Sequence, residues 1–385
     1  MPRSQLRIGI DASNIRAGGG VTHLAEVLGA ARPNEHGIAE ITVWASRPTL
    51  ERLPQHCWLR LVHEALLDGS LPARMLWQQT RATQLFRESC DLLFVPGGSY
   101  AGTFRPFVTM SQNLLPFETH ERRRYGYSFT RARLSMLRIT QARTFKRATG
   151  LIFLSEFARK IVAQKIGNCF AKSAVIAHGV AERFRQPARP QKPLSAYSNE
   201  RPFRWLYVSI VDVYKHQCEV AEAIALLRNA GFPVALDLIG PAYAPSLARL
   251  RTRISHLDSN GRFIQYLGQV SHSQLQRNYR DADGFVFASS CETFGQILLE
   301  AMASGLPIAC SNQSAMPEIL VDSGVYFHPE RPGEIAEALA KLMEQPDLRE
   351  SYAQLAGARA NSFSWEKCAA ETLSFLAQMA QESHS

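Results

Sequence analysis

The sequence predicts an α/β protein with two doubly wound, Rossmann-like domains, and three observations support this prediction. Short apolar runs typical of buried strands alternate with segments of helical periodicity along most of the chain, as in parallel sheets covered by helices on both faces. The 385 residues are enough for two domains of ordinary size. Finally, residues 185–202 contain four prolines in polar surroundings, which indicates a connection between domains.

The domain boundaries follow from this proline-rich segment. We assign residues 1–184 to a first domain and residues 203–364 to a second, with residues 185–202 as the linker. The pattern predicts strands at residues 6–12, 40–45, 58–63, 91–96, 107–111, 150–155, 174–178, 204–210, 234–240, 263–268 and 284–288.

Composition narrows the class of protein. Hydrophobic residues make up 46% of the sequence and charged residues 20%, which is the profile of a soluble globular enzyme. The seven cysteines are scattered and never form a C-x-x-C pair, so neither a disulfide framework nor a zinc site is indicated. Residues 1–7 lack the apolar core of a signal peptide, and no run approaches the ~20 apolar residues of a membrane span. We expect a cytoplasmic protein, with any membrane contact peripheral and at the inner face of the cell membrane.

The formal charge of +9 favours acidic partners, and its distribution points to one segment. Residues 122–147 hold nine basic side chains and no acidic one, interleaved with aromatic and aliphatic residues. This pattern indicates an interface for an anionic membrane surface. A core-packing helix with a solvated basic face is an equally good interpretation. Nucleic acid is not expected as a partner, because no recognisable nucleic-acid-binding module accompanies the charge.

The segment at residues 289–305 carries the strongest functional signal. It follows the predicted strand at 284–288 and leads into a helix that ends at Gly305, before Pro307. Free backbone N–H groups near Gly295, at the helix start, attract an anionic ligand. Glu292 lies in the turn, while Glu300 lies within the helix and is able to accept hydrogen bonds from a vicinal diol such as a ribose. The combination suggests a nucleotide-sugar site, although a capping glutamate and a surface glutamate would give the same spacing.

Other candidate residues lie at the ends of predicted strands. Gly18, Gly19 and Gly20 follow the first strand, where glycines let the backbone approach a phosphate or sugar closely. Lys215 follows the strand at 204–210 and is well placed to neutralise a diphosphate. The D-x-D spacing at residues 281–283 matches a metal-binding motif, but it lies between a predicted helix and a strand, so we interpret it as turn polarity and expect no metal.

Three runs of residues connect the chain to a known family: Glu292-Thr293-Phe294-Gly295, the segment 299–308, and Met316-Pro317-Glu318-Ile319. Together they resemble the signature of glycosyltransferase family 4, the retaining enzymes with the GT-B fold. The resemblance is closest to mannosyl and rhamnosyl transferases of bacterial surface polysaccharide synthesis. It implies two Rossmann-like domains that face each other across a cleft, with the helix at 365–385 packing back on the first domain.

The resemblance also implies residue roles. Glu292 would position the sugar as the catalytic carboxylate, and the donor would contact Lys215, Glu300, Thr293, Phe294, Gly295, Ser209, Gly268 and Val270. The donor and acceptor loops of the first domain would contribute Gly18, Gly19, Gly20, Asn113 and His178. Asn113 stands where the family often has a histidine, and the arginine usually found just before Lys215 is absent.

The expected function is retaining transfer of a hexose from a nucleotide-diphosphate sugar to a glycan or lipid-linked acceptor in cell-surface polysaccharide biosynthesis. A mannose or deoxy-mannose donor linked to GDP is favoured, and UDP is the alternative nucleotide. No cofactor and no metal are expected, since the nucleotide sugar is a co-substrate. A GT-B epimerase or phosphorylase, and a non-catalytic subunit that binds nucleotide sugar, are the other hypotheses.

Overall fold

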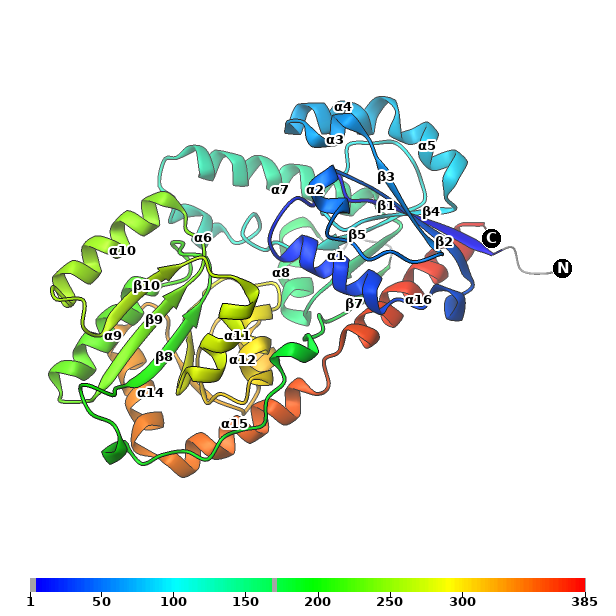
Figure 1. Ribbon diagram of the computed structural model, residues 1–385. Coiled ribbons are helices and arrows are strands. Elements are labelled where there is room, and N and C mark those ends of the chain that lie inside the picture. Colours follow the sequence, from blue (N-terminus) through cyan, green and yellow to red (C-terminus); the bar gives the residue numbers. More distant parts are fainter. Residues whose placement is uncertain (1–4, 168–171, 385) are drawn as a thin grey trace. The chain divides into compact units, whose positions relative to one another are not determined.

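The computed structural model describes residues 5–167 and 172–384, which form two units, each built on one parallel sheet (Figure 1). Unit 1 comprises residues 1–119, 127–179 and 364–385, and unit 2 comprises residues 120–126 and 180–363. The chain passes from one unit to the other at four points. Residues 120–126 therefore belong to unit 2, although the sequence around them belongs to unit 1.

Unit 1 contains a sheet of seven parallel strands in the order β3-β2-β1-β4-β5-β6-β7. The central strand β1 pairs on one side with β2, where Ile8 lies opposite Ile41, and on the other with β4, where Ile8 lies opposite Leu92. All three side chains are buried, as expected for a sheet covered on both faces. The strands are β1 (Leu6–Asp11), β2 (Ile38–Ala45), β3 (Leu59–His63), β4 (Leu92–Val95), β5 (Phe107–Ser111), β6 (Gly150–Phe153) and β7 (Ser173–Val175).

Helices connect these strands and cover the sheet. One core cluster of unit 1 gathers large aromatic side chains from β2, α4 and α5, with Trp44, Trp77 and Phe86 in contact through edge-to-face ring packing. The helices of unit 1 are α1 (Gly19–Ala30), α2 (Arg47–Leu50), α3 (Ala65–Asp68), α4 (Leu71–Thr80), α5 (Ala82–Ser89), α7 (Phe129–Arg147), α8 (Glu156–Ile166) and α16 (Trp365–His384), with the 3-10 turn η1 (Pro33–His36).

Unit 2 contains a sheet of six parallel strands in the order β10-β9-β8-β11-β12-β13. Its strands are β8 (Phe203–Val208), β9 (Val234–Ile239), β10 (Ile264–Gly268), β11 (Gly284–Phe287), β12 (Ile308–Ser311) and β13 (Val325–Phe327). Its helices are α9 (Gln217–Asn229), α10 (Ala244–Leu257), α11 (His272–Asp281), α12 (Gln296–Ala303), α13 (Met316–Leu320), α14 (Pro332–Glu344) and α15 (Pro346–Ala360), with the turns η2 (Glu182–Phe184) and η3 (Leu194–Ala196). The helix α6 (Thr119–Arg123) begins at the point where the chain enters unit 2.

This architecture confirms the predicted α/β class with two doubly wound parallel sheets. In each sheet the strand order reverses once, between β1 and β4 in unit 1 and between β8 and β11 in unit 2. Ligands of open α/β sheets bind at the carboxyl ends of the strands beside such a reversal. The loops that follow β8 and β11 are therefore where a site in unit 2 is expected.

The structure adds two strands to the predicted set and shortens several others. The prediction omitted the strands β12, of four residues, and β13, of three. The segment predicted as a strand at 174–178 is shorter, since β7 ends at Val175. The chain leaves the sheet there, although the Ile176 amide still donates to the Phe153 carbonyl at 2.8 Å.

The segment predicted as a linker, residues 185–202, is part of unit 2 and is bound to it by arginines. The buried Arg349 donates to the carbonyls of Leu342 and Met343, both at 2.6 Å, and also to the Lys192 carbonyl. It thereby satisfies carbonyls at the end of α14 and attaches the proline-rich segment to them. Arg189 donates to the Arg280 carbonyl at 2.5 Å. The proline-rich sequence therefore belongs to an extended segment that packs along unit 2. The chain enters unit 2 at residue 180, before the predicted linker begins.

Residues 120–126 are held in unit 2 by charge and by ring packing. Arg124 donates to Glu121 at 2.8 Å and forms a second ion pair with Glu330. The buried Tyr125 hydrogen-bonds Asp212 and packs its ring edge-on against Tyr243, with the centroids 5.8 Å apart. The basic stretch predicted at 122–147 is thus divided between the two units, and its Arg124 is neutralised by two carboxylates.

A buried histidine lies where α1 packs against α16. The His23 side chain is 1% exposed, and neither of its ring nitrogens has a hydrogen-bond partner in the described part of the chain. Its ring lies 4.7 Å from that of His178 and 5.8 Å from that of Trp365, centroid to centroid. Burial, and secondarily the charge of His178, hold the pKa of His23 well below its ordinary value of 6.5. The folded protein therefore contains His23 in its neutral form.

We predict that this histidine makes the protein less stable in mild acid. Below about pH 6.5 the unfolded chain binds a proton at His23 that the folded chain does not, so the unfolding free energy falls by up to about 1.4 kcal/mol per pH unit. Denaturant unfolding of His23→Leu between about pH 7 and pH 5 should show a weaker decline than wild type. The exposed His256→Leu serves as control and should keep the wild-type decline; an equal decline in all three proteins would contradict the prediction.

Candidate functional site

The strand reversal of unit 2 brings together two side chains that are 77 positions apart in sequence. Lys215, in the loop after β8, forms an ion pair with Glu292, in the loop after β11. Their side chains are only 7% and 18% exposed. An ion pair so shielded from water is weakly screened by salt, and either charge would be costly to leave without a partner.

Two aromatic rings contact the Lys215 ammonium, and two hydrogen bonds fix the Lys215 backbone. It lies 4.8 Å from the ring centroid of Tyr214 and 5.4 Å from that of Phe287, within the range of cation–π attraction. The Tyr207 hydroxyl donates to the Lys215 carbonyl, and the Lys215 amide donates to the Asp212 carbonyl at 3.1 Å. The loop geometry therefore fixes the lysine at the carboxyl end of the sheet.

Glu292 is fixed by a serine from another loop. The Glu292 amide donates to the Ser314 hydroxyl at 2.7 Å, and that hydroxyl donates back to the Glu292 carbonyl at 2.9 Å. Ser314 has a φ of +62°, a left-handed conformation that is uncommon outside glycine. This backbone conformation, in the loop after β12, is the kind of local strain that persists where surrounding contacts enforce it.

His216 and Ser290 form a second contact between the same two loops. The Nε2 atom of His216 lies 3.0 Å from the Ser290 hydroxyl, and the Ser290 amide donates to the Tyr214 carbonyl at 2.9 Å. Burial, followed by the charge of Arg124, lowers the pKa of His216 to about 4. At neutral pH the imidazole is uncharged, so Lys215 is the cation that these two loops bring to the carboxyl end of the sheet.

The predicted helix start at Gly295 is confirmed as a structural feature. Gly295 is the N-cap of α12 with φ of +94°, and a Cβ at this position would lie 2.7 Å from the Met316 side chain. Glycine is favoured there by its backbone conformation, while a Cβ would require the end of the flexible Met316 side chain to shift. Further along α12, the Glu300 carboxylate accepts a hydrogen bond from the buried Tyr279 hydroxyl at 3.2 Å. This bond orients Glu300 from the neighbouring helix α11.

The other predicted donor residues of unit 2 lie around these loops with different degrees of burial. Ser209 follows β8, and its carbonyl would be 2.1 Å from a Cβ on Gly240, so those two backbones approach as closely as glycine permits. Gly268 has φ of +70° at the end of β10, and Val270 follows it, both half-buried. Thr293 is half-buried, while Phe294 is 1% exposed with its ring against Phe363. The Phe294 side chain is therefore part of the core.

The predicted loop residues of unit 1 lie at or beyond the carboxyl ends of its strands. Gly18 caps α1 with φ of +65°; a Cβ on Gly18 or Gly19 would meet no atom within 4 Å, whereas one on Gly20 would lie 3.2 Å from Ile15. Asn113 is exposed, and its side-chain oxygen accepts from the Leu115 amide at 3.0 Å, which closes a turn. His178 packs against His23 and Trp365.

Four residues of the site were absent from the predicted set: His216, Ser290, Ser314 and Tyr279. Ser290 belongs to the segment at 289–305, and His216 is adjacent to Lys215, so their neighbours could have indicated them. Ser314 and Tyr279 lie on other elements and reach the site only through the fold. No local pattern in the sequence points to either.

The D-x-D residues Asp281 and Asp283 are structural. The Asp283 carboxylate accepts from the Tyr197 hydroxyl at 3.0 Å and from the Arg204 amide at 2.9 Å. Asp281 is the last residue of α11 and lies 3.3 Å from the Arg280 guanidinium. Both roles agree with the interpretation as turn polarity. Within residues 5–167 and 172–384, no three metal-ligating side chains gather as a metal site would require.

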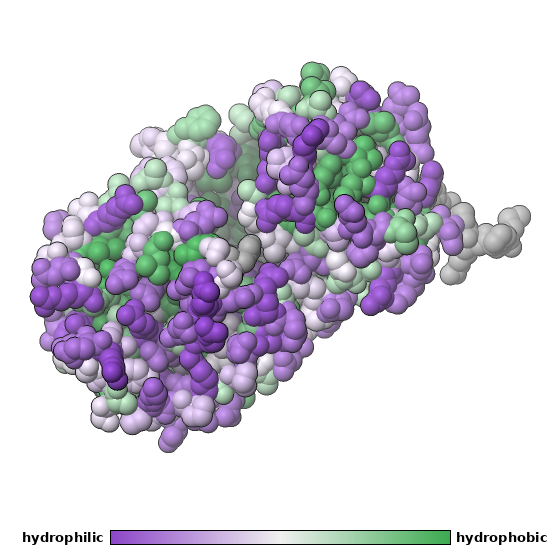
Figure 2. Space-filling model, in the orientation of Figure 1, coloured by the Kyte–Doolittle hydropathy of each residue, from purple (hydrophilic) through white to green (hydrophobic). Residues whose placement is uncertain are grey.

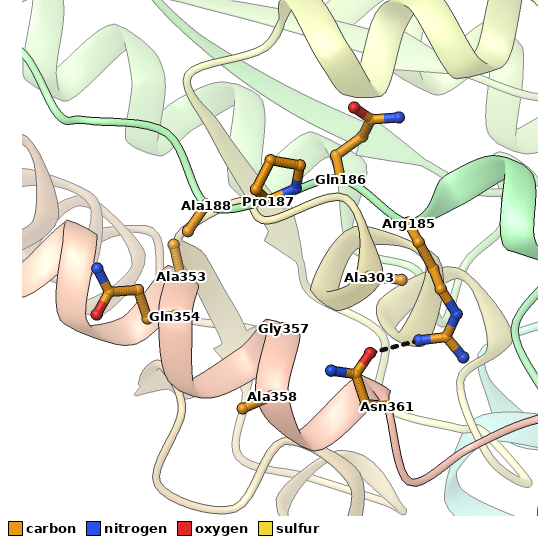
Figure 3. Close-up of a pocket in the computed structure, with 10 residues that line it drawn as sticks. All are labelled: Arg185, Gln186, Pro187, Ala188, Ala303, Ala353, Gln354, Gly357, Ala358 and Asn361. Carbon is orange, nitrogen blue, oxygen red and sulfur yellow. Dashed lines mark hydrogen bonds between the residues drawn. The ribbon is translucent and has the colours of Figure 1, made fainter.

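A separate cavity of about 500 Å³ lies between the proline-rich segment and α15 (Figure 3). Arg185 borders it and is already engaged, since it donates to the Asn361 side chain at 2.7 Å and to the Phe363 carbonyl at 3.1 Å. Ala303 at its edge is the last residue of α12, at the opposite end from Gly295. Because eight helical residues span about 12 Å, this cavity is distinct from the Lys215–Glu292 region.

Part of unit 2 is similar to a known family of proteins. Residues 191–358 match the family model of glycosyl transferases group 1. O-antigen chain mannosyltransferase B of Escherichia coli is 35% identical over 111 residues, which are 29% of this chain and 29% of that protein. A GDP-mannose-dependent alpha-(1-6)-phosphatidylinositol dimannoside mannosyltransferase of Mycobacterium tuberculosis is 30% identical over 171 residues, which are 44% of this chain and 42% of the relative. The matches span less than half the length of these relatives.

The likeness in structure covers nearly the whole chain. The crystal structure of Anabaena HepE in complex with UDP and glucose has a TM-score of 0.68 and 18% sequence identity, over 99% of this chain and 100% of that chain. The two Rossmann-like units thus have the fold of GT-B glycosyltransferases, as predicted. The residues that match the glycosyl transferases group 1 model, 191–358, lie within unit 2.

We predict strong energetic coupling between Lys215 and Glu292. Lys215→Met and Glu292→Gln should each lower the unfolding free energy by about 2–4 kcal/mol, because each leaves a poorly solvated charge without its partner, and the double variant should cost less than the sum. A double-mutant cycle by urea denaturation measures this coupling. The exposed Arg159–Glu156 pair, 2.6 Å apart, is the control and should couple by at most about 1 kcal/mol. Equal coupling in the two pairs would refute the prediction.

Proposed function

We propose, on the premise that this chain carries a glycosyl transferases group 1 domain, that it is a retaining glycosyltransferase. In this proposal it moves a hexose from a nucleotide-diphosphate sugar to a glycan or lipid-linked acceptor. The observation that carries the proposal is the arrangement after β8 and β11, where a shielded lysine and a carboxylate face each other. The glycine-initiated helix α12 begins shortly after that carboxylate.

The donor diphosphate is proposed to replace Glu292 as the ion-pair partner of Lys215. The Lys215 ammonium is neutralised by one carboxylate, that of Glu292. A diphosphate offers more negative charge and more acceptor oxygens, so it competes for the same cation and for the N–H groups at the start of α12. Release of Glu292 from the lysine then leaves a carboxylate beside the bound sugar, where it can orient hydroxyl groups and stabilise positive charge.

Glu300 is proposed to bind the ribose of the nucleotide. A carboxylate accepts two hydrogen bonds from vicinal hydroxyls, and the Tyr279 hydroxyl at 3.2 Å already limits the directions in which Glu300 points. A preoriented acceptor loses less conformational entropy when the ligand binds. Tyr279 acts in this proposal as a positioning residue, because its contact is with the carboxylate.

The proposed reaction breaks the bond between the anomeric carbon and the diphosphate oxygen and forms a bond to an acceptor oxygen on the same face. The transition state resembles an oxocarbenium ion and a departing diphosphate. Lys215 and the α12 N–H groups would stabilise the leaving charge, and Glu292 the sugar cation. The acceptor proton passes to the departing diphosphate, so no protein base is required. The neutral His216 accordingly has no part in the proton transfer.

Mannose or a deoxy-mannose linked to GDP is the donor we favour. Support for this choice comes from the two relatives described above, which are mannosyltransferases, one of them named as GDP-mannose-dependent. UDP is the competing nucleotide, since the matched HepE structure holds UDP and glucose. The O-antigen relative makes a cell-surface glycan the favoured type of acceptor. A non-catalytic subunit that binds nucleotide sugar is the second hypothesis, which the exposed Asn113 and the missing arginine favour.

Calorimetric titration of GDP, UDP and ADP tests the donor site. We expect one nucleotide, GDP, to bind with micromolar affinity, and Glu300→Ala to weaken it at least tenfold because the ribose loses its charged acceptor. Glu337→Ala, an exposed glutamate on α14, is the matched control and should bind as wild type does.

Several outcomes would reject parts of the proposal. Absence of binding by all three nucleotides, or equal binding by Glu300→Ala, would remove the basis for the donor site. Nucleotide binding without slow hydrolysis or transfer of the matching sugar donor would favour the non-catalytic subunit. Selective UDP binding would keep the enzyme class and replace the GDP donor.

A further inference from the structure

Exposed large hydrophobic side chains are concentrated on two helical regions of unit 1. Within the described residues, eight of the thirteen such side chains lie there. Tyr127, just before α7, is 104% exposed, and Phe129, Met136 and Ile139 on α7 are 84%, 68% and 49% exposed. The other four lie on α3 and α4: Leu66, Leu71, Met75 and Leu76. Figure 2 shows hydrophobic atoms over both regions.

The exposed face of α7 combines these apolar groups with cations. Phe129, Met136 and Ile139 are spaced by seven and three residues, which places them on one side of the helix. The exposed Arg133, Arg143 and Lys146 fall on the same side, and none of them forms an ion pair within the described part of the chain. The opposite side is buried through Leu134, Gln141, Thr144 and Phe145. The helix therefore packs on unit 1 by one face and presents an apolar and basic face to solvent.

The helix α4 presents a comparable face at the same end of unit 1. Its outward side carries Leu71, Met75 and Leu76, while Trp77 and Gln78 are buried. Between residues 71 and 87 the chain has three arginines and no acidic residue. The nearby Glu64 lies 3.5 Å from Arg81 and is neutralised by it.

Hydrogen bonds to one loop connect the two helices. The loop after β4 donates its Ala101 amide to Gln78 of α4 at 3.0 Å and its Tyr100 amide to Thr144 of α7, also at 3.0 Å. Arg147 at the end of α7 donates to the Gly102 carbonyl at 2.7 Å in the same loop. Both helices therefore flank the loop at the carboxyl end of β4, and Figure 1 shows them at one edge of unit 1.

We propose that the outward faces of α4 and α7 form a docking surface for an anionic lipid bilayer. Apolar side chains enter the interface between headgroups and acyl chains, and the arginines and Lys146 pair with lipid phosphates. Among candidate occupants, a bilayer fits the combination of exposed aromatic and aliphatic side chains with a positive field that no acidic residue of α7 offsets. Among the helices of residues 5–167 and 172–384, none has the length and apolar character of a membrane span.

Not all residues of the basic stretch at 122–147 belong to this surface. Arg124, predicted as part of it, is bound to Glu121 and Glu330 in unit 2. The surface begins instead at Tyr127 and gains the second helix α4, which the charge pattern of residues 122–147 did not include. The docking surface is independent of the donor reaction, because it involves no residue of the Lys215–Glu292 region.

Co-sedimentation of the full chain with lipid vesicles tests this inference. We expect binding to vesicles of phosphatidylcholine with phosphatidylglycerol, little binding to phosphatidylcholine alone, and a decrease with added salt. R133Q/R143Q should weaken binding about fivefold per removed charge. M136S/I139S should weaken it by about tenfold or more, since two apolar anchors are lost. L71S/L76S tests α4 in the same way.

Matched substitutions outside the surface serve as controls. R251Q/R262Q removes two exposed arginines of unit 2, and L226S/L355S removes two exposed leucines there; both should bind vesicles as wild type does. Nucleotide titration without lipid, performed on each variant, shows that the donor domain is intact. It also separates failure of the docking surface from failure of the proposed reaction.

Several results would overturn the inference. Binding that is equal for anionic and neutral vesicles, or equally weakened by the control variants, would exclude an anionic docking surface at these helices. Loss of binding in the α7 variants but not in L71S/L76S would remove α4 from it. Self-association without lipid that M136S/I139S abolishes, with no binding to vesicles, would identify the face as a protein interface.

Discussion

The ion pair between Lys215 and Glu292 is the interaction on which the functional part of unit 2 depends. Both charges are largely removed from water, so the surrounding residues must hold them together. Tyr207, Tyr214 and Ser314 do so through backbone bonds and ring contacts. In the proposed function the donor binds here by exchange, because an anion that replaces the carboxylate leaves the lysine with a partner.

The parallel sheets make this arrangement possible. Reversal of strand order between β8 and β11 separates the helices on the two sides and leaves room beyond the carboxyl ends. Residues from distant parts of the sequence then meet in two neighbouring loops. The same topology in unit 1 places the glycine loop after β1 and the loop after β4 at one end, and α4 and α7 flank the second of these loops. The fold thus places a shielded ion pair in one unit and an apolar, basic surface in the other.

Much of the fold could be predicted, because buried parallel strands such as 284–287 are continuous apolar runs with clear ends. The prediction nevertheless omitted the short strands β12 and β13. Lys215, Glu292 and Glu300 were predicted because a long motif and the ends of strands indicate chemistry at those positions. The pairing of Lys215 with Glu292 could not be predicted, since it depends on two loops 77 residues apart. The attachment of residues 120–126 to unit 2 was missed for the same reason: Arg124 finds Glu330 206 positions later, and no local pattern reports such a contact.

Binding of the donor in the loops after β8 and β11 is open to a direct measurement. Hydrogen–deuterium exchange of the full chain is compared with and without saturating GDP and UDP. The nucleotide that binds should slow amide exchange in residues 209–216 and 288–300, where the loop amides and the start of α12 would contact the diphosphate. Protection confined to other segments, with unchanged exchange in these two, would show that the donor binds elsewhere.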